Sequence, residues 1–82
     1  MMAFPAQLTD REWKAEVATA VDGPGLPFRI DAAWVEARSF TCRADFSDRR
    51  TGQPRHVEVS HTQFPTAADR RAEIVRLLRR PA

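Results

Sequence analysis

Three residues in the second half of the chain, His56, Glu58 and His61, have side chains that bind metal ions. Successive side chains of a β-strand point to opposite faces, so a strand would place His56 and Glu58 together and His61 on the other side. Three ligands at this spacing cannot converge on one ion. We therefore expect neither a metal site nor a cofactor.

Cys42 and His61 are residue types that can form a nucleophile and its base. We expect both on the buried face of a sheet, where apolar surroundings raise the pKa of a thiol, the wrong direction for a nucleophile. No serine lies in a glycine-framed elbow, and Gly23 and Gly25 precede a predicted strand instead of the helix that a phosphate loop requires. We predict no catalytic residue, and thus a protein that is not an enzyme.

Arginine supplies all but one of the 13 basic side chains, although the net charge is only +2. Arginine recognises phosphate groups well, but a GC-rich bacterial or phage-like genome would produce the same bias without any function. Arg49, Arg50 and Arg55 surround a predicted hairpin loop, and Arg70 and Arg71 lie in the first turn of a predicted helix. Nucleic-acid binding through these five arginines is the alternative function.

The elements that position these residues begin with a helix over 9–21. Thr9 and Glu12 have the spacing of a capping box, and Leu8 and Trp13 that of a hydrophobic staple. Apolar side chains then recur every four residues, at Trp13, Val17 and Val21. Two glycines and two prolines within 22–27 end the helix.

Strands are predicted over 28–35, 39–46 and 55–62, because apolar and polar side chains alternate there with a period of two. This alternation assigns the following residues to the core face: Phe28, Ile30, Ala32, Trp34, Phe40, Cys42, Ala44, Phe46, Val57, Val59 and His61. A short helix over 32–38, capped by Asp31, is a rival interpretation, because these residues have fair helical propensity.

The polar face of the strands indicates how they pair. Joining the first two strands so that Trp34 opposes Phe40 brings opposite charges together, Asp31 with Arg43 and Arg29 with Asp45. Joining the second and third strands so that Ala44 opposes Val57 also brings opposite charges together. The second register creates the pairs Arg43–Glu58, Asp45–His56 and Thr41–Ser60. We predict an antiparallel meander with a ladder of charges on its exposed face.

A second helix is predicted over 66–80, capped by Thr66 and with Ile74 and Leu78 on its apolar face. Both helices should pack on one face of the three-stranded meander, giving a two-layer α+β domain of order α-β-β-β-α over 1–82, with a tail over 1–7. The expected core cluster is Trp13, Trp34, Phe40, Phe46, Val57 and Leu78. Phe40→Ala should then cost ~3–5 kcal/mol of stability.

This order of elements resembles that of double-stranded RNA-binding domains, in which the hairpin loop and the start of the second helix contact the duplex. The resemblance concerns the order only. Those domains carry a lysine cluster at the start of the second helix, where this chain has Ala67-Ala68-Asp69-Arg70-Arg71.

A non-catalytic domain that binds another protein, or a second copy of itself as a homodimer, is the function we favour. Several apolar side chains lie outside the predicted core, namely Ala33, Val35 and Ala37 on the first strand with Met1, Met2 and Phe4. That strand is at a sheet edge, where backbone groups can pair with another chain. One cysteine excludes an internal disulfide, and no apolar run is long enough for a membrane span, so we expect a cytoplasmic protein without membrane contact.

Overall fold

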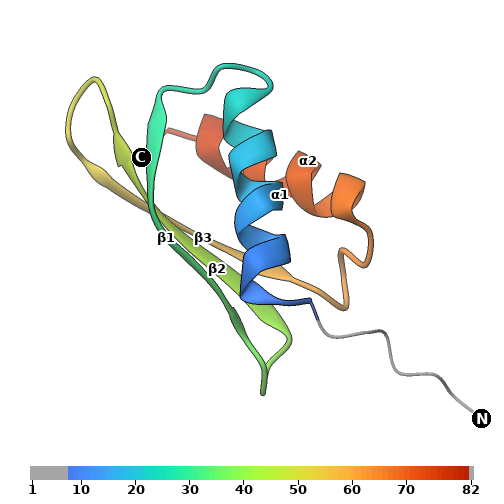
Figure 1. Cartoon of the computed structure of the whole chain (residues 1–82). Helices are drawn as coiled ribbons and strands as arrows, with labels where there is room; N and C mark the ends of the chain where they lie inside the picture. Colours follow the sequence, from blue (N-terminus) through green and yellow to red (C-terminus); the bar gives the residue numbers. More distant parts are fainter. Residues whose placement is uncertain (1–7, 82) are drawn as a thin grey trace, which may run out of the picture.

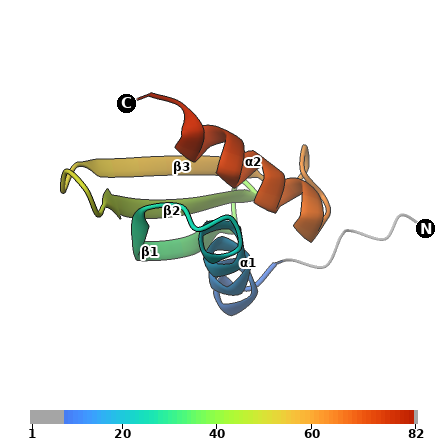
Figure 2. The ribbon, with the colours of Figure 1, turned by 90° about the horizontal axis from the view of Figure 1, so that it is seen from above.

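Two helices cover one face of a three-stranded antiparallel sheet in the computed structural model, which describes residues 8–81 (Figure 1). The elements in chain order are α1 (Asp10–Asp22), β1 (Phe28–Glu36), β2 (Thr41–Asp48), β3 (Pro54–Ser60) and α2 (Ala67–Arg79). The strands lie in the order β1-β2-β3, with α1 against β1 and α2 against β3 (Figure 2). The predicted α-β-β-β-α fold is confirmed. The predicted tail, with Met1, Met2 and Phe4, lies outside the described residues.

The capping box at the start of α1 is confirmed. The Thr9 hydroxyl accepts a hydrogen bond from the Glu12 amide at 3.1 Å, and the Glu12 carboxylate accepts one from the Thr9 amide at 3.2 Å. Hydrogen bonds from Thr9 also lower the pKa of Glu12. A helix that begins here places Trp13 one turn later, on the side facing the sheet. Trp13 is fully buried, and its indole Nε1 donates to the Arg43 carbonyl at 2.8 Å.

The core lies between the helices and the sheet. Phe28 and Phe46 pack edge to face, with ring centroids 6.2 Å apart. The buried apolar side chains are Leu8, Trp13, Val17, Ala20, Val21, Phe28, Ala33, Cys42, Ala44, Phe46, Val57, Val59, Ile74 and Leu78.

The register predicted for the second and third strands is confirmed. Ala44 opposes Val57, Arg43 opposes Glu58, and Asp45 opposes His56. The apolar members of this ladder are buried under the helices, and the charged members lie on the other face.

The register predicted for the first two strands is wrong. Trp34 opposes Arg43 instead of Phe40, and the register shifts between Ile30 and Ala32. The shift makes Asp31 the extra residue of a β-bulge, which reverses the alternation for the rest of β1. Ala33 is consequently buried, whereas Trp34 lies on the outer face beside His56. The rival helix over 32–38 is also wrong, because β1 continues as a strand to Glu36.

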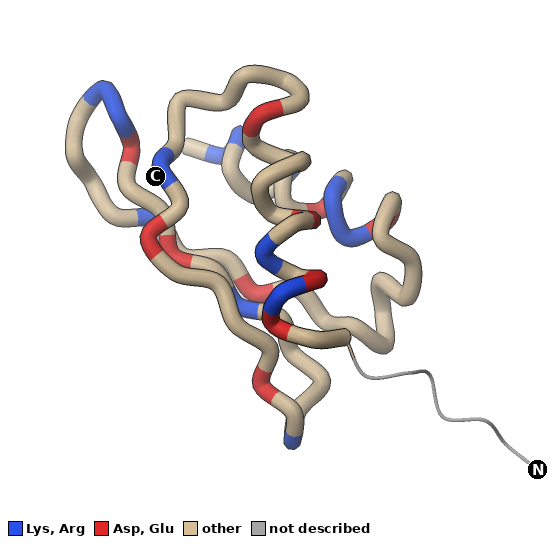
Figure 3. Tube along the Cα trace, in the orientation of Figure 1, with Lys and Arg blue, Asp and Glu red and all other residues tan. Residues whose placement is uncertain are grey.

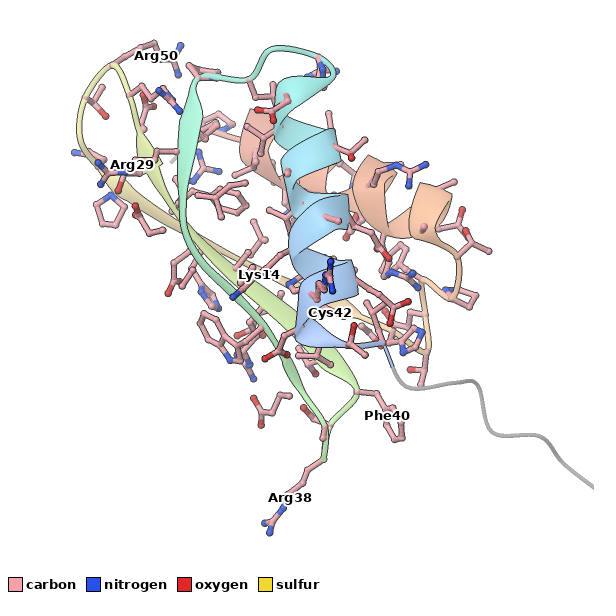
Figure 4. All side chains as sticks on the ribbon, viewed as in Figure 1. Lys14, Arg29, Arg38, Phe40, Cys42 and Arg50 are labelled. Carbon is pink, nitrogen blue, oxygen red and sulfur yellow. The ribbon has the colours of Figure 1, made fainter. Side chains whose placement is uncertain are left out.

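Phe40 belongs to the turn between β1 and β2 and not to the core. Its φ of 51° lies in the left-handed region, and 38% of the residue is exposed. Figure 4 shows its side chain beside the end of this hairpin, pointing away from that of Arg38 at the tip. The prediction of one buried cluster of six residues is therefore wrong for Trp34 and Phe40. The large cost of truncation expected for Phe40 belongs to the fully buried Phe46.

Candidate binding surfaces

The face of the sheet opposite the helices carries a connected set of charges around one tryptophan. We call it the ladder face, and it consists of Trp34, Glu36, Arg43, Asp45, His56 and Glu58. Arg43 donates from Nε to Glu36 at 2.7 Å and from Nη1 to Glu58. His56 lies between Asp45, 2.6 Å from Nδ1, and Glu58, 3.2 Å from Nε2. The predicted cross-strand pairs between β2 and β3 are thus present.

These contacts favour the charged forms of the two basic groups. The hydrogen bond to Asp45, and secondarily that to Glu58, raises the pKa of His56 above its ordinary value. The hydrogen bond to Glu36 raises the pKa of Arg43. The Trp34 ring, with its centroid 6.4 Å from that of His56, adds an apolar surface of the kind enriched at protein interfaces.

The two edges of the sheet differ in how their backbone groups are used. The Val35 amide on β1 donates to Asp10 Oδ1 of α1 at 2.8 Å, so it points away from β2. Hydrogen-bonded and non-hydrogen-bonded pairs alternate along an antiparallel ladder. The alternation therefore turns the N–H and C=O groups of His56 and Glu58 away from β2, toward the open edge of β3. Within residues 8–81 neither amide has an acceptor.

The residues predicted to bind a partner lie elsewhere than expected. Ala33 is 4% exposed and belongs to the core, and Val35 packs against it, so the prediction that they lie outside the core is wrong. Ala37 is exposed in the β1–β2 turn. The bulge at Asp31 causes this change, since it turns the odd-numbered residues after it toward the helices.

The five arginines predicted to bind nucleic acid do not form one surface. Arg70 is buried, and its Nε and Nη2 donate to the two oxygens of Glu16 at 2.6 and 2.8 Å, while Nη1 donates to the Phe64 carbonyl. Arg71 lines a separate pocket together with Thr19 of α1 and Pro24. Arg49 and Arg50 belong to the β2–β3 loop, and Figure 4 shows Arg50 at the end of the sheet opposite Phe40.

Arg55 joins a different group of arginines that the sequence reasoning missed. Because α2 runs back along β3, its last turn lies beside the first residues of that strand, and Arg55 Nη2 donates to the Leu77 carbonyl at 2.9 Å. Here a pocket of about 380 Å³ opens. We call it the arginine pocket, and its charged lining is Arg50, Arg55, Arg79 and Arg80 with Asp48. Figure 3 shows basic segments both in the β2–β3 loop and at the end of α2.

Cys42 is fully buried, and burial raises the pKa of its thiol to about 11. At neutral pH the thiol is therefore protonated, which is unsuited to nucleophilic attack. His61 is also buried. Within residues 8–81 no three histidine, cysteine or acidic side chains are grouped so as to hold a metal ion. Over the same range no helix has both the length and the apolar character needed to cross a bilayer.

Comparisons with protein-family models, with curated proteins and with solved structures give no match. The ladder face, the edge of β3 and the arginine pocket are therefore the features from which a function can be argued.

Proposed function

We propose that this chain is a non-catalytic module that binds a second copy of itself through the edge of β3. The observation that carries the proposal is the contrast between the two sheet edges. Asp10 occupies one outward amide of β1, that of Val35, whereas no group within residues 8–81 occupies the outward amides of His56 and Glu58 on β3. An open strand edge pairs readily with another strand.

The order of charges on β3 favours a second copy over an unrelated strand. If two β3 strands pair antiparallel about Val57, each His56 lies opposite the Glu58 of the other copy. Both are outward-facing residues, so each such pair exchanges backbone hydrogen bonds. Shifting the axis by one residue opposes Glu58 to Glu58 in one direction or His56 to His56 in the other, and both bring like charges together. Charge therefore selects a single symmetric register.

The raised pKa of His56 supports the same register. Since Asp45 favours the protonated imidazole, a larger fraction of His56 is positive near neutral pH, and the positive form attracts the opposing Glu58. Arg43 also holds Glu58 through its Nη1, so the glutamate is already directed along the ladder face. A rigid pair of opposite charges loses little side-chain entropy on association.

Sedimentation equilibrium over about a hundredfold range of protein concentration tests this proposal. We expect a reversible monomer–dimer equilibrium that Glu58→Lys weakens about tenfold, because the new lysine opposes His56 of the second copy. Glu36→Lys is the matched control. It removes the other carboxylate that accepts from Arg43, but it lies on β1 and should leave the dimer unchanged.

A second variant tests the backbone contribution. His56→Pro removes an N–H that points away from β2, so the ladder within one copy keeps its hydrogen bonds. We expect a folded monomer. A wild-type chain that stays monomeric throughout the concentration range, or a dimer that both lysine variants weaken equally, would overturn the proposal.

A further inference from the structure

The arginine pocket has apolar walls and charged groups placed around them. Leu26, Pro27 and Phe28 contribute from the segment that begins β1, and Leu78 and Pro81 contribute from the end of α2. Arg50 comes from the β2–β3 loop, Arg55 from β3, and Arg79 and Arg80 from the last turn of α2 and its cap. Segments from four parts of the chain therefore converge on one concave surface.

Two of the four guanidinium groups are held in place. Arg55 is half-buried, lies 5.6 Å from the centroid of the Phe28 ring and donates to the Leu77 carbonyl. Arg50 donates from Nε and Nη2 to the carboxylate of Asp48, at 3.2 and 3.1 Å. Held guanidinium groups lose less conformational freedom when they bind a ligand than free ones do.

The charge of the pocket is strongly positive. Four arginines face one acid, Asp48, whose pKa the hydrogen bond from Arg50 lowers. The nearest acid along α2, Glu73, is already paired with Arg76 at 2.7 Å. The negative end of the α2 dipole opposes an anion. The Leu77 carbonyl at that end is, however, already used by Arg55 Nη2 and the Arg80 amide.

We propose that the arginine pocket binds a phosphate group. Guanidinium forks match the geometry of phosphate oxygens and bind them in pairs of hydrogen bonds. The apolar side chains of the lining that are at least partly exposed, Leu26, Pro27 and Pro81, suit the sugar or base attached to a phosphate. The phosphate belongs either to a free nucleotide or to a nucleic-acid backbone, and the volume of the pocket admits the phosphate with one attached sugar.

NMR titration of the full chain tests the proposal with inorganic phosphate, a nucleoside monophosphate and a short nucleic-acid duplex. We expect saturable shifts of backbone amides in 26–28, 48–55 and 77–80 that sodium chloride of equal ionic strength does not reproduce. Tighter binding of the monophosphate identifies a free nucleotide as the ligand. Tighter binding of the duplex, with a steep loss of affinity as salt rises, identifies a nucleic-acid backbone.

Two double variants of equal charge separate this site from a general effect of charge. Arg79→Gln/Arg80→Gln removes two positive charges from the pocket and should weaken phosphate binding about tenfold. Arg11→Gln/Arg38→Gln removes the same charge from exposed positions outside the pocket, and binding should change less than about twofold. Equal losses in both variants, or shifts that chloride reproduces, would overturn the proposal.

The phosphate site does not depend on the proposed dimer. Glu58→Lys lies outside the pocket lining and should leave the phosphate titration unchanged while it weakens self-association. Loss of one property without the other thus identifies which proposal has failed.

Discussion

The molecule contains two groups of ion pairs in opposite surroundings. Between the helices, Glu16 and Arg70 keep only 10% and 5% of their side-chain surface exposed, and two parallel hydrogen bonds join them. On the ladder face, Glu36 and Glu58 are 47% and 51% exposed on either side of Arg43. The chemistry is the same in both groups, but water screens only the second.

This difference in exposure shows what each group of ion pairs contributes to the protein. Burying Glu16 and Arg70 costs desolvation energy, which their attraction and the bond to the Phe64 carbonyl offset. The pair therefore fixes how α1 packs against α2 more than it adds net stability. The ladder face costs little to form, contributes little, and leaves its charges accessible to a partner.

Breaking the buried pair should have the largest effect. Arg70→Ala leaves Glu16 without a partner inside the protein, and we expect a loss of ~3–5 kcal/mol. A domain of this length is stabilised by only about 4–12 kcal/mol, so the loss removes roughly a quarter or more of its stability. Urea denaturation followed by tryptophan fluorescence measures the loss. A change within experimental error would mean that water already reaches the pair.

Replacing both partners sharpens the comparison. Glu16→Met/Arg70→Met removes the desolvation cost together with the attraction, and the double variant should be as stable as the parent or more stable by about 1–4 kcal/mol. The same denaturation experiment applies. If the double variant is as unstable as Arg70→Ala, the pair contributes net stability and the comparison drawn above fails.

Arg43→Gln on the ladder face should lower the melting temperature by only about 1–3 °C, because water and salt screen its pairs with Glu36 and Glu58. The difference from the parent should shrink further in 0.5 M salt, at about half the usual Debye length. Calorimetry at low and high salt checks both statements. A large, salt-independent loss would place the ladder face in the same class as the buried pair.

The smallest effect should be a pH dependence from His56. Its pKa is raised in the folded chain, so its stabilisation is fully present below the unfolded value of about 6.5 and disappears as the pH rises through the folded value. Because 44% of the His56 side chain is exposed, water screens its pairs and this amounts to only about a few tenths of a kcal/mol. Urea midpoints of the parent and of His56→Gln should therefore converge with rising pH. Urea midpoints that differ by the same amount at every pH would contradict the raised pKa of His56.

The pairing of β2 with β3 could be predicted from the charges on the polar face of these strands. Along β2 and β3, charges and apolar residues alternate without interruption, so Arg43–Glu58 and Asp45–His56 agree with one register. On β1 the bulge at Asp31 places two successive residues on the outer face. The neighbours Ala32 and Ala33 are equally small and apolar, so the sequence contains little evidence of the change of phase.

The sequence contains evidence for the buried pair, because both charged residues lie on the apolar faces of their helices. Arg70 precedes Ile74 and Leu78 at intervals of four, on the stripe of α2 that faces the core. Glu16 likewise lies among the buried residues of α1, between Trp13 and Ala20. Opposite charges on the buried stripes of two helices indicate an internal pair. The arginine pocket could not be found in this way, because its residues meet only through the return of α2 along β3.

The hydrogen bond from the Val35 amide to Asp10 bears on how the protein begins to aggregate. Asp10 is the first residue of α1, and its carboxylate also occupies the Val35 amide on the edge of β1. Helix ends fray more readily than whole domains unfold, so one brief opening of this turn releases the amide while the rest of the fold persists. Hydrogen exchange at Val35 should report that opening. Each such event offers a template for strand addition and thus a starting point for aggregation without global unfolding.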